Sequence, residues 1–345
     1  MKKEIGNLIV GLLLGCLLLN SAVAQENQKL AQSGLKFLSV VSDARAAAMG
    51  EAMTSLQVGS SALFFNPAGM SEMTNLVDVT ASTNQWIADI KHYTFSLAVN
   101  PAGGDYGVFG VSVQSVNYGD FYGTVVNPLA SSGLGYDETG TFQLNALAVG
   151  FGYARKLTDR FCIGGQIRWV HQNLGSTVVP EFITSADTSG IDTIRAFRDN
   201  TMTPLVFDFG LQLKTNIKSL VFGMSIRNFS REVKYAEEGF QAPLIFNLGV
   251  SMNMLDLIEE PVEEQALYMS VDASHYRDHP EEIKVGLDYR FMNMVSLRAG
   301  YISSNDESSF SYGAGVSKFG VTVDYAYTPF GVFGKVNRVT ARFAM

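Results

Sequence analysis

The chain has 345 residues, of which 47% are hydrophobic and only 17% are charged. An ordinary soluble domain carries about 25% charged residues, so the composition excludes a disordered tail and leaves a charge deficit to be explained. The formal net charge of −8 argues against a nucleic-acid partner. The only cysteines are Cys16, inside a predicted leader, and Cys162, so no disulfide or paired-cysteine metal site is expected.

The first 24 residues have the pattern of a secretory signal peptide. Two lysines precede an apolar run over 8–19, and residues 22–24 supply the small side chains of a cleavage site. The run is shorter than the ~20 residues of a membrane-spanning helix, which favours cleavage over an anchor. A lipoprotein signal at Cys16 is disfavoured, because leucines continue the apolar run after it. We predict a signal peptide over 1–24 and export from a bacterial cytoplasm.

The following segment, 25–76, carries helix and turn signals. Ser42 or Asp43 can cap a short alanine-rich helix over 44–49, with Gly50 interrupting it and Gly59 as its terminator. Residues 66–69 then have the composition of a turn. We predict that this segment is separate from the strands that begin at residue 77.

From residue 77 onward, apolar residues recur at every second position. Over 205–213, leucine and phenylalanine alternate with residues that are mostly polar or small, and this period of two indicates a strand. The same alternation predicts fourteen strands, over 77–86, 90–99, 105–118, 141–155, 160–173, 204–215, 219–230, 242–255, 266–274, 281–291, 294–303, 308–318, 320–328 and 336–345.

The length and number of these strands predict an all-β membrane protein, a 14-stranded antiparallel outer-membrane β-barrel over 77–345. Tilted membrane-crossing strands need about 9–11 residues, and a final strand at the chain's end can close the ring without a free edge. Long predicted loops over 119–140, 174–203 and 231–241 follow odd-numbered strands, as extracellular loops should. The acidic connection over 257–265 departs from this parity, and we interpret it as a solvated turn rather than a partner-docking site.

Charged residues on the strands are predicted to face the lumen, because each would cost roughly 2–4 kcal/mol on the lipid face at the midplane. Both signs of charge favour a cross-strand network over a selective permeation ring. Glycine and serine recur on the same face and leave room for an inserted segment, so 25–76 is predicted to be a short helical plug. The candidate lumen residues are Arg168, Asp208, Arg227, Asp272, Lys284, Asp288, Arg290, Arg298, Asp324, Arg338 and Arg342.

Three stretches before the first strand resemble a known family. They read GLKFL over 34–38, DARAAAMGEA over 43–52 and ALFFNPAGM over 62–70. Together they resemble the N-terminal signature of the PorV/PorQ family, which belongs to the FadL-like group of fourteen-stranded outer-membrane barrels. The resemblance assigns a plug motif to Arg45, Gly50, Asn66, Pro67 and Gly69.

The same resemblance implies a role in type IX protein secretion. A PorV-like protein binds the C-terminal signal domain of exported cargo through extracellular loops and passes it to the surface attachment machinery. Its expected partners are outer-membrane lipid, type IX translocon and attachment proteins, and cargo C-terminal domains. The apolar loop over 174–203 is either a partner-binding surface or a lid over the barrel mouth, and its candidate contact residues are Phe182, Ile183, Ile191, Ile194 and Phe197.

A FadL-like channel for a hydrophobic ligand is the alternative function. A narrow, salt-bridged lumen would favour secretion, whereas a continuous apolar tunnel beside the plug would favour transport. An enzyme is the third possibility, since His275, Asp278 and His279 could in principle hold a metal. These residues are predicted to lie on a loop without helical spacing to align the two imidazoles. We expect no catalytic residues, no metal and no cofactor.

Overall fold

The computed structural model describes residues 33–56, 59–126, 133–184, 191–234, 239–258, 264–304 and 308–345, with the side chains of 177–198 excluded from the description. The predicted signal peptide therefore lies outside the described residues, as does the predicted segment up to residue 32. Within these ranges, no helix has both the length and the apolar character needed to cross a membrane.

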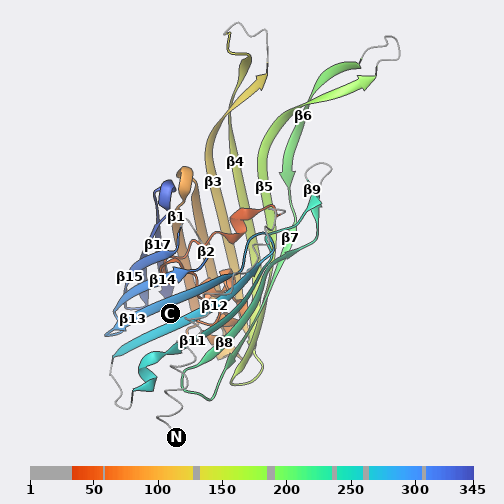
Figure 1. Ribbon diagram of the computed structural model, residues 1–345. Coiled ribbons are helices and arrows are strands. Elements are labelled where there is room, and N and C mark those ends of the chain that lie inside the picture. The colour runs from red at the N-terminus through yellow and green to blue at the C-terminus, as the bar shows by residue number, and fades with distance from the viewer. Residues whose placement is uncertain are drawn as a thin grey trace.

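Fourteen strands form a closed antiparallel barrel (Figure 1). β1 pairs with both β2 and β17, and β4 pairs with β5, so the ring has no open edge. The predicted fold class is thereby confirmed. The strands of the ring are β1 Val77–Gln85, β2 Lys91–Val99, β3 Val108–Val126, β4 Tyr136–Lys156, β5 Phe161–Thr184, β7 Leu205–Lys214, β8 Val221–Ser230, β11 Ile245–Asn253, β12 Gln265–Tyr276, β13 Glu282–Phe291, β14 Val295–Ile302, β15 Phe310–Lys318, β16 Val321–Pro329 and β17 Lys335–Ala344.

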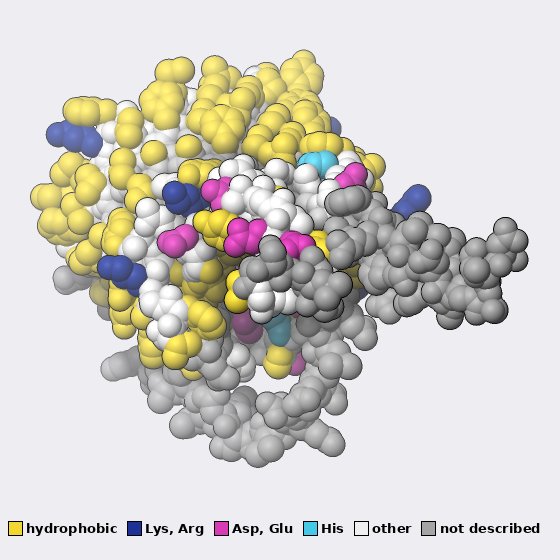
Figure 2. Space-filling model, turned by 90° about the horizontal axis from the view of Figure 1, so that it is seen from above, with side chains coloured by type: hydrophobic (Ala, Val, Ile, Leu, Met, Phe, Trp, Pro, Cys, Tyr) yellow, Lys and Arg dark blue, Asp and Glu magenta, His cyan; other side chains and the backbone are white. Residues whose placement is uncertain are grey.

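The alternation in the sequence separates the two faces of the wall. Leu205, Phe209 and Leu213 of β7 are exposed on the outside, whereas Asp208 and Gln212 are buried inside. Figure 2 shows hydrophobic side chains gathered over the outer wall, with charged side chains nearer the rim. An apolar exterior and a polar interior are what a lipid-embedded barrel requires.

The predictions of loops over 119–140 and 174–203 are wrong, because strand pairing continues into both stretches. The first holds the extended ends of β3 and β4, and the second holds the extended end of β5 and an additional strand, β6. β3 and β4 continue pairing from Asp120↔Gln143 to Val126↔Tyr136, with register shifts on the way. The extension of β5 pairs with β6, Ile191–Met202, where the sequence predicts a loop over 174–203. Both hairpins project beyond the rest of the barrel, at the top of Figure 1. On β3 and β4, most side chains of these extensions are exposed on both faces, so apolar alternation is lost although the backbone ladder continues.

The two ends of the barrel differ. One end carries the two projecting hairpins, and we call it the hairpin end. The other end carries the short connections after β2, β4, β7, β13 and β15, and we call it the short-turn end. The remaining short elements are η4 Ile87–Asp89, η5 Pro101–Gly104, β9 Val233–Lys234, β10 Gly239–Phe240, η6 Met254–Leu257 and η7 Gly331–Phe333.

The described part of residues 33–76, which we call the lumen segment, runs inside the ring (Figure 1). Its α2 packs against β14 to β17, and its η3 packs against β4, β5 and β7. The segment carries every described helix that precedes β1, namely η1 Lys36–Ser39, α2 Ala44–Ala48, η2 Ser60–Phe64 and η3 Pro67–Glu72.

Asp43 begins the alanine-rich helix, because its Oδ1 accepts a hydrogen bond of 2.8 Å from the backbone N–H of Ala46. The helix ends at Ala48, before Gly50, which has a left-handed φ of 58°, a conformation that glycine adopts without strain. The prediction that Gly59 terminates this helix is wrong. Gly59 instead precedes η2, and its φ of 79° turns the chain into that element.

Candidate functional site

At the hairpin end, the lumen segment lies in an apolar part of the wall. Leu35, Phe37 and Leu38 are buried there, and the backbone carbonyl of Phe37 accepts a hydrogen bond of 2.7 Å from Gln114. Lys36 forms an ion pair with the buried carboxylate of Asp278. We call the surrounding wall residues the apolar seat; they are Val116, Ala146, Ala148, Val170, Met202, Val206 and Ala242.

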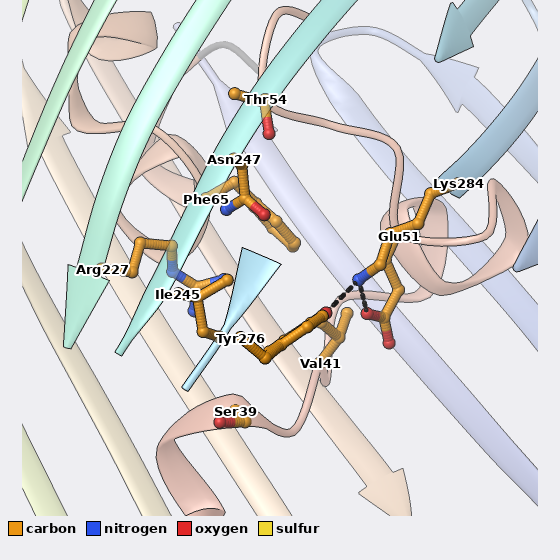
Figure 3. Close-up of a pocket in the computed structure, with 10 residues that line it drawn as sticks. All are labelled: Ser39, Val41, Glu51, Thr54, Phe65, Arg227, Ile245, Asn247, Tyr276 and Lys284. Atoms are coloured by element: carbon orange, nitrogen blue, oxygen red, sulfur yellow. Dashed lines mark hydrogen bonds and ion pairs between the residues drawn. The ribbon is translucent and has the colours of Figure 1, made fainter. Parts of the chain in front are cut away.

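Farther along the segment, Glu51 meets a buried lysine of the wall (Figure 3). The Nζ of Lys284 lies 2.8 Å from Glu51, 3.5 Å from Glu282 and 2.7 Å from the hydroxyl of Tyr276. Burial raises the pKa of Glu51, but the charge and hydrogen bond of Lys284 outweigh it and hold that pKa below its ordinary value. This pair ties α2's downstream turn to β13.

A cavity of about 20 Å³ adjoins this pair and is lined by Arg227, which is also buried. The Arg227 guanidinium lies 5.8 Å from the centre of the Phe65 ring. A cavity of this size holds about one water molecule. The space is therefore too small for an organic ligand in this structure.

A second ionic group surrounds Asp288 of β13. Its carboxylate lies 3.3 Å from Arg45, 3.1 Å from Arg290 and 3.1 Å from Arg298, and Arg298 also lies 2.7 Å from Asp324. Burial and the nearby charge of Arg290 lower the pKa of Arg45 to about 10, although the charge of Asp288 opposes them. Arg45 of the predicted plug motif is therefore joined to predicted lumen residues.

The other plug-motif residues fix the chain against the wall. The Asn66 side-chain amide donates hydrogen bonds to the carbonyls of Thr54, at 2.8 Å, and Leu211, at 2.9 Å. Its Oδ1 accepts a hydrogen bond from the backbone N–H of Ala68. Asn66 thereby caps η3, which begins at Pro67. Gly69 is buried within η3.

The remaining predicted lumen residues do not form one network. Arg168 pairs with Asp208 at 2.8 Å. Two others bond the backbone of the lumen segment: Asp272 accepts from the N–H of Thr54 at 2.9 Å, and Arg338 donates to the carbonyl of Val41 at 2.9 Å. The charged residues of the wall therefore bind the lumen segment as well as one another.

Sequence reasoning missed several partners of these charges. Arg342 pairs at 2.6 Å with Asp78, which lies at the start of β1. Glu72 accepts from Lys214 and from the thiol of Cys162. Glu51 lies within the stretch over 43–52 that resembles the family signature. Its apolar sequence neighbours do not indicate a charged partner 233 residues away.

Two further predictions concern the partner-binding loop and the possible metal-binding histidines. The side chains of Phe182, Ile183, Ile191, Ile194 and Phe197 lie outside the described residues, although the backbones of β5 and β6 pair there. His275 bonds Glu281 while His279 packs on Tyr276. No cluster of three metal-ligating side chains occurs in the described ranges. The acidic connection over 257–265 also falls partly outside them, at 259–263.

Two larger cavities lie beside the lumen segment at the short-turn end, with volumes of about 280 and 260 Å³. Arg45, Arg290 and Arg342 line both of them. Neither is an apolar tunnel, since serine, threonine and charged side chains dominate both walls.

No protein-family model and no curated protein matches the chain. Solved structures do match it. The monoaromatic hydrocarbon channel CymD has a TM-score of 0.55 at 12% identity, over 88% of this chain and 97% of its own. The toluene transporters TbuX of Ralstonia pickettii and TodX of Pseudomonas putida have TM-scores of 0.54 and 0.53, each at 13% identity. They cover 87% and 92% of this chain, and 96% and 98% of their own.

The chain has the fold of these FadL-like outer-membrane channels. Its barrel belongs in the bacterial outer membrane, as the sequence predicts, and its apolar outer wall suits that place. At 12–13% identity the likeness concerns the fold.

Proposed function

We propose that the chain is an outer-membrane channel for small hydrophobic molecules and has no enzymatic activity. The apolar seat carries this proposal. The lumen of a membrane barrel is normally polar, yet here Val116, Val170 and Val206 face inward and cover the apolar side chains of Phe37 and Leu38. A wall of this kind favours a lumen that takes up apolar groups, because burial of apolar surface contributes about 25 cal/mol per Å².

In this proposal, the lumen segment occupies the route that the ligand takes. A hydrophobic molecule that displaces Phe37 and Leu38 would contact the same wall side chains. The start of the segment is the part that moves in this proposal. Its ion pair between Lys36 and Asp278 is half exposed on the lysine side, and exposed ion pairs contribute little stability. The similar structures support a ligand of this class, because CymD is a monoaromatic hydrocarbon channel and TbuX and TodX are toluene transporters.

Uptake of radiolabelled toluene by bacteria that lack other channels of this fold tests the proposal. Cells that carry the chain should take up toluene faster than cells with an empty vector. Met202→Glu should reduce this gain roughly tenfold or more, because it places an unpaired charge in the apolar seat, where burial costs several kcal/mol. Thr201→Glu is the matched control, since Thr201 is the exposed neighbour on the same strand.

Uptake that equals the empty-vector rate, with the barrel present in the outer membrane, would contradict the channel. Equal uptake by Met202→Glu and the wild type would instead contradict the seat as the route. Heat-modifiable migration in gels provides the check that each variant forms a barrel.

A PorV-like role in type IX secretion is the second candidate. The three N-terminal stretches that resemble the PorV/PorQ signature favour it, and so does the ionic contact of the lumen segment with the wall at Glu51 and Arg45. The test is mild detergent purification from the native host, followed by mass spectrometry. Secreted proteins that share a C-terminal domain, or a very large barrel partner, would support secretion over transport.

A further inference from the structure

The cavity of about 260 Å³ at the short-turn end has no apolar side chain in its lining. It lies between α2 and the strands β1 and β13 to β17, and its thirteen lining residues are four arginines, two aspartates, six serines or threonines, and one asparagine. Such a wall provides hydrogen-bond donors and positive charge. It therefore suits a small polar anion rather than a hydrophobic molecule.

The charges around this cavity do not pair one to one. Arg45, Arg290 and Arg298 share the carboxylate of Asp288, and Arg298 also contacts Asp324. Arg342 pairs with Asp78. These four guanidinium groups thus contact three carboxylates. The remaining aspartate of the lining, Asp43, caps α2 through Oδ1, and its carboxylate also lies within the electrostatic reach of Arg45 and Arg298.

Arg290 is the arginine best placed to bind a ligand. It donates from Nε and Nη2 to Asp288, at 3.2 and 3.1 Å, and its side chain remains 32% exposed. A guanidinium has five N–H donors, so these two bonds leave donors for another acceptor. The guanidinium carbon lies 4.8 Å from the centre of the Tyr268 ring, so the ring packs against one face of the group.

We propose that this cavity is a binding site for a phosphate group, with Arg290 as its principal donor. Arg342 and the hydroxyls of Ser296 and Thr322 line the same cavity. A planar guanidinium matches two oxygens of a phosphate at once, and hydroxyl groups complete the coordination. The site is independent of the hydrophobic route, because the apolar seat lies at the other end of the barrel.

The test is equilibrium binding to the full chain in an uncharged detergent. Inorganic phosphate and glycerol 3-phosphate are titrated in parallel, with sodium chloride holding the ionic strength constant. We expect saturable binding of at least one of them. Tighter binding of glycerol 3-phosphate would identify a phosphate ester as the ligand, and equal or tighter binding of inorganic phosphate would identify the free anion.

Arg290→Gln should weaken this binding at least tenfold, whereas Arg160→Gln should leave it unchanged. Arg160 is an exposed arginine in the connection between β4 and β5, at the same end of the barrel, so it controls for the loss of one positive charge. No saturable binding of either compound would overturn the site. Equal binding by Arg290→Gln and the wild type would overturn it as well.

A second variant covers the case in which Arg290→Gln does not fold. Asn293 lines the cavity from the turn between β13 and β14, is exposed and has a φ of 51°, which aspartate tolerates as asparagine does. Asn293→Asp places a negative charge at the rim and should weaken phosphate binding severalfold. Unchanged affinity in this variant would overturn the proposal.

Discussion

At the scale of single residues, the ion pair between Glu51 and Lys284 is the strongest test of how the lumen segment is held. Lys284 is buried and lies close to two carboxylates and one phenol. Lys284→Met keeps the length of the side chain but leaves Glu51 and Glu282 without their cation. Loss of one partner of a buried pair costs about 3–5 kcal/mol, so the urea midpoint of unfolding in detergent should fall markedly.

The matched control is Lys335→Met, because Lys335 is an exposed lysine at the start of β17. Its urea midpoint should stay within error of the wild type, since exposed charges contribute little. If the two variants unfold at the same urea concentration, the buried pair does not hold the segment.

The pH dependence of stability gives a separate test of Glu51. Its pKa in the folded protein lies below the ordinary value of 4.5, so the folded state favours the ionised carboxylate. The resulting stabilisation is complete above pH 4.5 and is lost as the pH falls through the depressed pKa. The wild type should therefore lose more stability below that pH than Glu51→Gln does. Urea midpoints measured from pH 7 downward give the comparison, and parallel curves would contradict the assignment.

At the scale of elements, close approach between the lumen segment and the wall depends on glycine. A Cβ on Gly164 of β5 would lie 2.5 Å from the backbone N of Ala68, whereas the nearest atom to a Cβ on Gly165 lies at 3.5 Å. Gly164→Ala should therefore displace the turn at Pro67 and cost about 1–3 kcal/mol. Gly165→Ala, on the adjacent position of the same strand, should cost much less.

Urea unfolding of the two glycine variants measures the difference, and limited proteolysis reports whether residues 59–76 become accessible. Both variants should keep the heat-modifiable migration of a barrel. Equal stability of Gly164→Ala and Gly165→Ala would mean that η3 adjusts to the added methyl without loss.

The same scale shows why sequence predicts some elements and not others. The alternation over 205–213 predicts β7 because one face meets lipid and the other the lumen. Over 119–126 no side chain on either face is buried, so nothing in the residue types distinguishes a strand extension from a loop. The avoidance of lipid by charged residues predicts which strand residues face the lumen, but it does not predict which of them pair. Glu51 and Lys284, for example, are 233 residues apart. Their pairing depends on the path of the segment, which the local pattern does not contain.

At the scale of the whole molecule, the hairpin formed by β5 and β6 is separable from the ring. β5 pairs with β4 and β7 only up to Asn173, and Val170 already bonds the carbonyl of Pro204. Replacement of residues 176–199 by Asn-Gly, a favoured two-residue turn, should therefore leave the barrel and Met202 of the apolar seat in place. Far-ultraviolet circular dichroism and heat-modifiable migration should show an intact barrel.

This deletion also separates the two candidate functions, because it removes Phe182, Ile183, Ile191, Ile194 and Phe197 together. If the chain is a channel whose route begins at the apolar seat, toluene uptake should persist within about twofold, since the seat residues and Phe37 remain. If the hairpin binds exported cargo, proteins that co-purify with the intact chain should be lost from the shortened one. An intact barrel that loses toluene uptake would place the hairpin in the transport route and would contradict the seat as its entrance.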